Sequence, residues 1–284
     1  MKPKFDVASP FDAGALQRAH GAAHVSFRRR GQHTVLEDLH QSGCLKVRFP
    51  RDEVIGWATA VVLNMSGGVT GGDRLDTQFV VRPHACVTIT AQAAERFYRA
   101  LPGSDPAIVR NRLTVEQGAC AEWLPQETLL FEHCALDRQL DIELNQDAWF
   151  LGIEALVFGR AAMGERVAHA WLRDGIRIRR DGHLLMREVI RLDGAVDDIM
   201  QRRAVANGAR AVATLIHCVP GAELATEPLR AALASAPAEA GASTWNGLLV
   251  ARMLAPDAAT LRCTIIAAIQ ALRGSRPLPR VWLC

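Results

Sequence analysis

Apolar and polar residues alternate along most of the chain between residues 21 and 193. In the clearest run, Leu75, Thr77, Phe79 and Val81 share one face, and the residues between them are mostly polar. A period of two is typical of a β-strand with one buried face. Turn-forming residues recur roughly every 8 to 12 positions through this region, which predicts an all-β body of many short strands.

Three local patterns depart from simple alternation. The segment from Trp149 to Phe158 is apolar on both faces except at Glu154, as in a strand that is covered on two sides. The dipeptides Asp174-Gly175 and Asp181-Gly182 each predict a hairpin turn. The segment from Glu95 to Leu101 comes nearest to a helical period and predicts about two helical turns at most.

The pattern changes near Asp193, after which helical periods appear between apolar strands. The sequence predicts a short helix or loop at 196–203 and a buried strand at 210–218. A helix at 227–234 follows, with Thr226 as its N-cap. A strand at 245–254 and a long helix at 257–273 complete the series. The alanine-rich stretch from Ala234 to Ala242 predicts a surface connection. This order describes a small C-terminal strand-helix-strand-helix portion.

The helix predicted at 257–273 has the strongest signal. Asp257 is a suitable N-cap and Gly274 a suitable stop. Its apolar stripe consists of Leu261, Ile265, Ile266, Ile269 and Leu272.

Three segments follow from these patterns: a flexible lead-in at residues 1–20, a β body at 21–193 and a C-terminal α+β portion at 194–284. Nothing between the last two resembles a flexible linker. We therefore expect them to pack on one core as a single domain.

Four glycines in six residues mark the segment from Asn64 to Asp73: Gly67, Gly68, Gly71 and Gly72. Such a density is needed where the backbone takes positive φ or approaches another group closely. A dinucleotide fingerprint is excluded because no G-x-G occurs, and a phosphate-binding P-loop is excluded because Asp73 stands where lysine is required. A strand follows, so no helix N-terminus is available for an anion. We expect a turn between two strands, with Asp73 accepting hydrogen bonds from loop amides.

Composition narrows the class of protein. The 284 residues are 49% hydrophobic and 22% charged, with a net charge of +3, which describes a globular chain. One tyrosine and no basic block longer than Arg28-Arg29-Arg30 argue against nucleic-acid binding.

No apolar run has the length of a membrane span, and the N-terminus lacks the apolar region of a signal peptide. With seven scattered cysteines and no CxxC, we expect a cytoplasmic location.

Motifs for catalysis or for a closed metal site are absent from the sequence. There is no H-E-x-x-H, H-x-H, CxxC or G-x-S-x-G. His20 and His24 are four residues apart, with His33 and His40 further on, but the local sequence resembles the start of a strand, so we expect solvated histidines. We expect no tightly bound cofactor.

Several short motifs occur in a fixed order from Gly67 to Trp282. They are Gly67-Gly68-Val69-Thr70-Gly71-Gly72-Asp73, Thr88-Ile89-Thr90 followed by Ala94-Glu95-Arg96-Phe97-Tyr98-Arg99, Glu122-Trp123-Leu124-Pro125-Gln126-Glu127-Thr128, Gly159-Arg160 with Gly164-Glu165, and Leu278-Pro279-Arg280-Val281-Trp282. In this ordered set the chain resembles the urease accessory protein family UreD, called UreH in some bacteria.

The resemblance implies a mainly β fold in which many short strands stack in a helicoidal two-sheet, β-helix-like body with a few helices. It implies a scaffold rather than an enzyme. Such proteins bind apo-urease (UreABC) and recruit UreF and then UreG, a GTPase that carries nickel. The assembly inserts two nickel ions beside a carbamylated lysine of urease, and an internal channel is the proposed nickel route. Any nickel on this chain would be transient.

Four carboxylates are candidates for the wall or portal of such a channel: Asp73, Glu127, Glu154 and Glu165. They lie beside glycine or proline turns or, for Glu154, inside an apolar strand. Nickel accepts carboxylate, imidazole and backbone oxygen ligands. The alternative for each of them is a structural ion pair.

The C-terminal portion is a candidate for the UreF contact because an amphipathic helix precedes a proline-stiffened tail that bears a tryptophan. The residues proposed for this contact are Leu261, Ile265, Ile269, Leu272 and Trp282. The alternative is that Trp282 closes the core.

Two other classes of function stay open from the residues alone. One is a hydrolase or lyase on a β scaffold, with paired carboxylates about 5 to 10 Å apart in an open groove. The other is a binding module that acts without urease.

Overall fold

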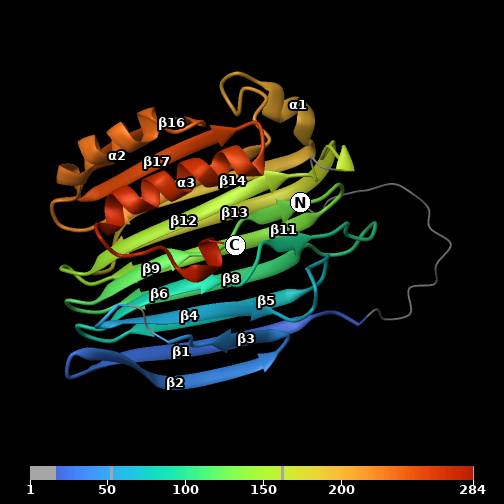
Figure 1. The fold of residues 1–284 in the computed structure, drawn as a ribbon. Helices are drawn as coiled ribbons and strands as arrows, with labels where there is room; N and C mark the ends of the chain where they lie inside the picture. Colours follow the sequence, from blue (N-terminus) through green and yellow to red (C-terminus); the bar gives the residue numbers. More distant parts are fainter. Residues whose placement is uncertain (1–16, 52–53, 161–162, 284) are drawn as a thin grey trace.

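The computed structural model describes residues 17–51, 54–160 and 163–283, and these residues form two stacked β-sheets with helices at one side (Figure 1). The smaller sheet has seven strands in the order β14 (His183–Ala195), β13 (His169–Arg180), β11 (Ala135–Leu144), β8 (Ala107–Val115), β5 (Arg74–Val81), β1 (His20–Arg30) and β2 (His33–Gly43). The larger sheet runs β16 (Glu239–Trp245), β17 (Leu248–Ala255), β15 (Ala211–Cys218), β12 (Trp149–Phe158), β9 (Cys120–Leu124), β6 (Cys86–Ala91), β4 (Trp57–Asn64) and β3 (Leu45–Arg48). Beside this path, β10 (Thr128–Leu130) pairs with β12 and β7 (Glu95–Phe97) pairs with β10.

The chain winds between the two sheets from β4 to β13. Strands β5, β8, β11 and β13 are parallel neighbours in one sheet, and β4, β6, β9 and β12 are parallel neighbours in the other. Each turn of the winding therefore adds one strand to each sheet in the same direction. The predicted helicoidal two-sheet body is confirmed.

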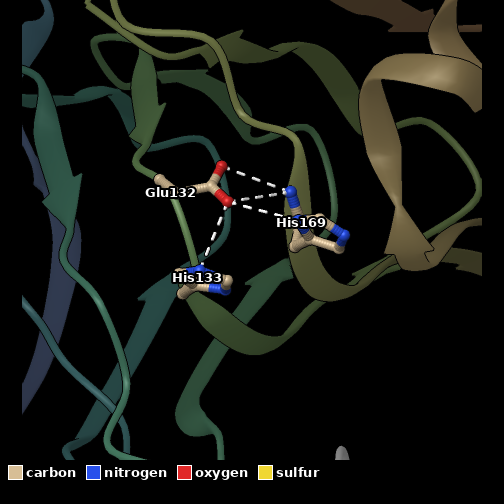
Figure 2. A group of neighbouring side chains, drawn as sticks. All are labelled: Glu132, His133 and His169. Carbon is tan, nitrogen blue, oxygen red and sulfur yellow. Dashed lines mark hydrogen bonds and ion pairs between the residues drawn. The ribbon is translucent and has the colours of Figure 1, made fainter. Parts of the chain in front are cut away.

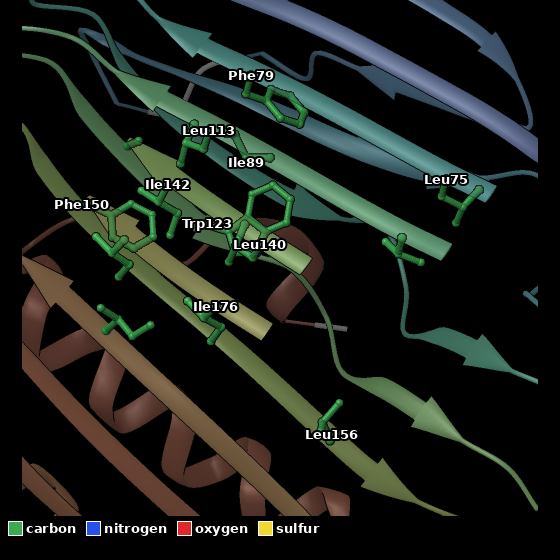
Figure 3. Packing of buried hydrophobic residues seen from close by; sticks show 14 of the residues in the cluster. Leu75, Phe79, Ile89, Leu113, Trp123, Leu140, Ile142, Phe150, Leu156 and Ile176 are labelled. Atoms are coloured by element: carbon green, nitrogen blue, oxygen red, sulfur yellow. The ribbon is translucent and has the colours of Figure 1, made fainter. Parts of the chain in front are cut away.

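The main core lies between the sheets (Figure 3). Strand alternation directs Phe79, Leu113 and Ile142 into this layer, where each is at most 2% exposed. Burying one such side chain stabilises the fold by roughly 1.5–3 kcal/mol, so this layer is the main source of cohesion.

The C-terminal portion continues the larger sheet. Strand β15 pairs antiparallel with β12, and β17 and β16 follow it. Helices α2 (Thr226–Ala234) and α3 (Ala258–Arg273) cover the outer face of these strands and bury a second apolar cluster (Figure 1). The remaining helical segments are α1 (Val196–Gln201), η2 (Ala222–Ala225) and η3 (Arg280–Trp282).

The ends of α3 agree with the sequence. The Asp257 carboxylate accepts a hydrogen bond of 2.8 Å from the Thr260 amide, and Gly274 ends the helix with φ of 61°. The N-cap predicted for α2 is wrong: Ala225 occupies the cap position without a side-chain hydrogen bond, because η2 leads directly into α2.

Three other local predictions are wrong. The segment predicted as helical after Glu95 forms β7, which gains a partner strand in β10. The alanine-rich connection contains the first residues of β16, an edge strand that pairs with β17. Asp174-Gly175 lies inside β13, whereas Asp181-Gly182 is the true turn, with φ of 49° and 76°. Of the predicted lead-in, residues 1–16 lie outside the described residues, and His20 already begins β1.

Candidate functional site

Three charged side chains meet in the layer between the sheets. Arg138 on β11 and Asp174 on β13 are paired in register in the smaller sheet, and Glu154 on β12 reaches them from the larger one. The Arg138 guanidinium donates to both Asp174 oxygens at 2.7 Å, and its Nη1 lies 2.8 Å from Glu154 Oε2. Trp123 Nε1 donates to Glu154 Oε1 at 2.8 Å. All four carboxylate oxygens therefore have a partner although the cluster is buried.

The charges of this interior cluster do not balance, since two carboxylates share one guanidinium. Burial raises the pKa of Glu154 above its ordinary value of 4.5, the Asp174 charge adds to the rise, and Arg138 and Trp123 oppose it. Burial lowers the pKa of Arg138, but the charges of Asp174 and Glu154 outweigh burial, so its pKa is raised and it stays charged. An unbalanced buried carboxylate is costly unless a proton or a cation neutralises it.

A cavity lies on each side of this interior cluster. One has a volume of about 210 Å³, and its polar lining comes from Glu154, Asp174, Glu188, Thr214 and Arg252. The other has a volume of about 110 Å³, and its polar lining comes from Thr77, Thr90, Glu95, Asn111, Gln126, Thr128, Arg138 and Glu154. Both can hold water, whose share of the liquid volume is about 30 Å³. Glu154 lines both cavities, so it is the link between them.

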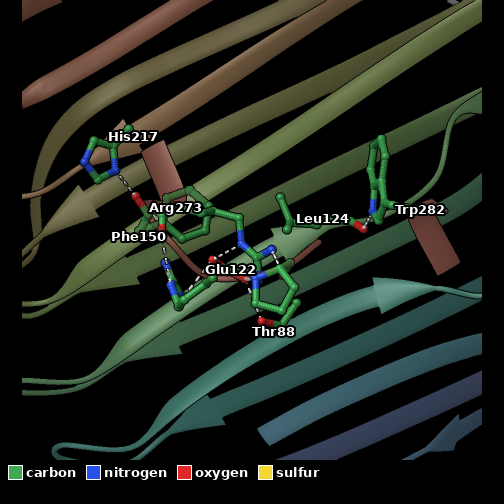
Figure 4. A network of polar contacts seen from close by, with 9 residues as sticks. Thr88, Glu122, Leu124, Phe150, His217, Arg273 and Trp282 are labelled. Carbon is green, nitrogen blue, oxygen red and sulfur yellow. Dashed lines mark hydrogen bonds and ion pairs between the residues drawn. The ribbon is translucent and has the colours of Figure 1, made fainter. Parts of the chain in front are cut away.

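A second buried ion cluster lies on the outer face of the larger sheet (Figure 4). Glu122 on β9 is completely buried and accepts from Arg273 at the end of α3 at 2.8 and 3.0 Å. It also accepts from the Thr88 hydroxyl at 2.6 Å and lies 2.9 Å from Arg276. This cluster attaches the end of α3 to the sheet.

Two of the sequence motifs meet next to Glu122. Trp282 Nε1 donates to the Leu124 carbonyl at 3.1 Å (Figure 4), and Gln126 Nε2 donates to the Val281 carbonyl at 3.0 Å. Glu127 forms an ion pair of 2.9 Å with Arg262 of α3. The W-L-P-Q-E motif and the L-P-R-V-W tail thus form one structural unit with α3.

The structure corrects the residues proposed for the UreF contact. Leu261, Ile265 and Ile269 are fully buried against the chain's own strands, and Trp282 is 2% exposed. Leu272 is half-buried beside them. The amphipathic stripe of α3 covers the larger sheet because that sheet presents its second apolar cluster there.

The glycine loop is a turn that closes on its own aspartate. Asp73 Oδ2 accepts from the Thr70 amide of the loop at 2.8 Å, as expected from the sequence. Its Oδ1 accepts from the Ala19 amide, also at 2.8 Å, which ties the loop to the segment before β1 and was not expected. Gly68 has φ of 142°, and a Cβ there would lie 2.3 Å from the Tyr98 ring. The first glycine pair therefore permits close packing against the Arg96-Phe97-Tyr98 motif.

Two motifs contact Phe131. The Tyr98 ring meets Phe131 edge-on at 5.2 Å between centroids, and the Arg160 guanidinium lies 4.6 Å above the same ring. Arg160 also pairs with Glu165 at 2.6 Å. Burial raises the pKa of Glu165, but the hydrogen bond from Arg160 and others outweigh it, so the pKa is lowered.

Comparison with known proteins identifies the family. The model of the UreD urease accessory protein family matches residues 19–283. The chain belongs to the UreD family. A UreD from Xanthobacter autotrophicus is 42% identical over 278 residues, which is 97% of this chain and 94% of the relative. One from Rhizobium leguminosarum bv. trifolii is 41% identical over 94% of this chain and 96% of the relative, and one from Rhodopseudomonas palustris is 42% identical over 95% of each.

Membership of the UreD family supports a role in urease maturation and is consistent with the expectation that the chain is not an enzyme. A hydrolase would need paired carboxylates on an open face, whereas Glu154 and Asp174, which share Arg138, lie in the interior. Across the described residues, no helix is long and apolar enough to cross a membrane.

The four carboxylates singled out in this UreD sequence do not converge on one place. Glu154 lies between the sheets, Glu127 under α3, Glu165 beside Phe131 and Asp73 in the glycine loop. Glu127, Glu154 and Glu165 each form an ion pair, and Asp73 is held by amides. Glu154 differs from the other three because it lines two cavities.

Sequence reasoning missed the partners of these carboxylates. Arg138 and Arg262, and likewise Arg273 as the partner of Glu122, carry no local signal, since each lies on an ordinary strand or helix and meets its carboxylate through tertiary packing. Glu132 and His169 were also missed, because they are 37 residues apart and belong to different elements. His20 and His24 lie on β1, where His24 is 3.3 Å from Asp76.

Proposed function

We propose that this chain is a cytoplasmic scaffold for urease maturation that binds apo-urease (UreABC), recruits UreF and the GTPase UreG, and conducts nickel through its interior. The observation that carries the nickel route is the unbalanced Arg138–Glu154–Asp174 cluster with a cavity on each side. In this proposal nickel is cargo that leaves the chain, and no ion is retained as a cofactor.

The interior suits weak and successive binding. A conduit needs several ligands that release the ion, and carboxylate, hydroxyl and amide oxygens along the two cavities are such ligands. Glu154 has a raised pKa and lines both cavities, so it can exchange a proton for a passing cation. Either the proton or the cation would neutralise the excess negative charge of the Arg138–Glu154–Asp174 cluster.

The other three carboxylates fit the proposal less well. Both Asp73 oxygens are already engaged, one by the Thr70 amide and one by the Ala19 amide, and Glu127 is engaged by Arg262. Glu165 is held by Arg160, whose guanidinium lies over the Phe131 ring. We therefore assign the route to Glu154 and treat Glu165 as the portal candidate.

Nickel loading of urease tests this assignment. The chain would be co-expressed with a urease operon that lacks its own UreD, and nickel per urease would be measured together with capture of UreF and UreG. We expect Glu154→Gln to lower nickel loading several-fold while complex assembly stays intact. Glu223→Gln is the matched control, because Glu223 is exposed on η2 and lines neither cavity.

Two outcomes would contradict the proposal at different levels. Full nickel loading by Glu154→Gln with intact assembly would remove Glu154 from the route. A nickel-free urease in the presence of the unaltered chain would overturn the role in maturation itself.

A further inference from the structure

Three potential metal ligands lie together near Phe131, outside the interior cluster (Figure 2). They are Glu132, His133 and His169, and one ligand atom of each lies within 4.8 Å of the others. Glu132 Oε1 is 3.4 Å from His133 Nε2 and 3.5 Å from His169 Nδ1. Among the described residues this is the one group of three or more such side chains that could hold an ion.

Backbone contacts from three parts of the chain hold the group in place. The His133 amide donates to the His169 carbonyl at 2.8 Å, and the His133 carbonyl accepts from the Ala100 amide at 2.9 Å. The His169 amide donates to both Glu132 oxygens at 3.2 Å. Glu132 and His133 follow β10, and His169 begins β13, so two turns of the winding meet here.

His133 adopts a backbone conformation that costs energy. Its φ is 59°, in the left-handed region, which disfavours a residue with a Cβ by about 1–2 kcal/mol. The surrounding hydrogen bonds compensate for this cost, and the conformation turns the imidazole towards Glu132 (Figure 2). Strained residues of this kind cluster at functional sites.

We propose that Glu132, His133 and His169 form an open binding site for a divalent transition-metal ion of the nickel and zinc class. Two imidazoles and one carboxylate are ligands that such ions share. With bond lengths of about 2.0–2.1 Å, neighbouring ligand atoms lie roughly 3.0–3.4 Å apart, close to the spacing of the Glu132 oxygen from each imidazole. His169 is 54% exposed, so its ring can rotate to complete the site.

The site is open rather than closed. Three protein ligands leave coordination positions for water or for a ligand from a partner, as in sites that exchange their contents. The identification of the ion as nickel rests on the proposed function, whereas the site itself does not. The Glu132 amide also donates to Glu165 Oε1 at 3.3 Å, which connects the site to the Gly164-Glu165 motif.

The competing explanation is a carboxylate that merely accepts hydrogen bonds from two histidines. Metal titration of the tag-free, full-length chain at pH 7.5 separates the two, using NiCl₂ and ZnCl₂ in equilibrium dialysis. We expect His169→Ala, His133→Asn and Glu132→Gln each to remove one bound equivalent or to weaken its binding about tenfold or more. Asparagine at 133 tolerates the positive φ, so this variant tests the ligand rather than the backbone.

His183→Ala is the matched control, since His183 is an exposed histidine on β14 outside the group. It should bind metal as the unaltered chain does. Unchanged stoichiometry and affinity in all three site variants would overturn the proposed site. If the site variants lose the bound metal that the unaltered chain retains, and the unaltered chain still loads urease with nickel, the site is supported. If the unaltered chain binds metal here but never activates urease, the site stands and the proposed function fails.

Discussion

At the scale of single residues, Glu154 shows how one polar position shapes an apolar strand. It is the only charged residue of β12, and it points into the layer between the sheets. Its carboxylate is held by Arg138 and Trp123, but burial still raises its pKa. The fold tolerates this residue because every oxygen has a donor, and a carboxylate in such a costly place suggests a function.

The raised pKa of Glu154 predicts a pH-dependent stability. The folded state binds this proton more tightly than the unfolded chain, whose value is about 4.5, so the free energy of unfolding decreases as pH rises from 4.5 through the folded pKa. We expect Glu154→Gln to remove this decrease and to be at least as stable as the unaltered chain at pH 8. Urea unfolding at several pH values measures both effects.

The exposed substitution Glu223→Gln serves again as the control and should leave the pH profile unchanged. A loss of more than about 2 kcal/mol in Glu154→Gln at pH 8 would contradict this prediction, since it would show that the ion pair with Arg138 outweighs the cost of burial.

At the scale of elements, α3 packs one face on the core and exposes the opposite face. Its apolar stripe packs on the larger sheet, and Arg273 at its end binds the buried Glu122. Only the opposite face is open to a partner, at Ala259, Cys263 and Gln270. If UreF binds the C-terminal portion, the candidate that the sequence offered, this outer face is the contact.

A charge on the outer face of α3 tests the UreF contact. We expect Cys263→Arg to weaken UreF capture in a pull-down several-fold without changing the melting temperature, because Cys263 is exposed. Gln32→Arg, in the exposed turn between β1 and β2, introduces the same charge elsewhere and should have no effect. Capture at full strength by Cys263→Arg would place UreF on another surface.

At the scale of the whole molecule, the larger sheet is shared by two apolar layers. One face packs against the smaller sheet, and the other packs against α2, α3 and the C-terminal tail. The buried ions Glu122, Arg273 and Arg276 lie beneath the tail, so the tail also shields charges from water. Trp282 in this tail is 2% exposed and packs in the second apolar cluster.

Trp282 is therefore expected to contribute strongly to stability. Trp282→Ala would leave a cavity beside Leu124 and lower the free energy of unfolding by about 3–5 kcal/mol. Trp282→Phe retains most of the apolar volume and loses only the hydrogen bond to Leu124, so a smaller loss is expected. Urea unfolding gives both values, and a loss below about 1 kcal/mol for Trp282→Ala would show that the tail is dispensable for the core.

Features that depend on neighbouring residues could be predicted from the sequence alone. Alternation of apolar and polar positions predicted the strands, the helical period and Asp257 predicted α3, and the ordered motifs indicated the family. Glu154 stood out because it interrupts an apolar run. Asp174-Gly175 misled the prediction because a turn-forming dipeptide is a local signal that strand pairing overrides.

Which charges meet depends on how the strands and helices pack, and local sequence carries no signal of it. Arg138 reaches Asp174 across 36 positions of sequence, Thr88 reaches Glu122 across 34, and Arg273 reaches Glu122 across 151. The first two separations correspond to one turn of the winding, and the third brings α3 back over the sheet. Periodicity shows which face a residue occupies, but register and layer order set its partner, and both depend on packing along the whole chain. The same reason hid the Glu132, His133 and His169 group, which exists only where two turns of the winding come together.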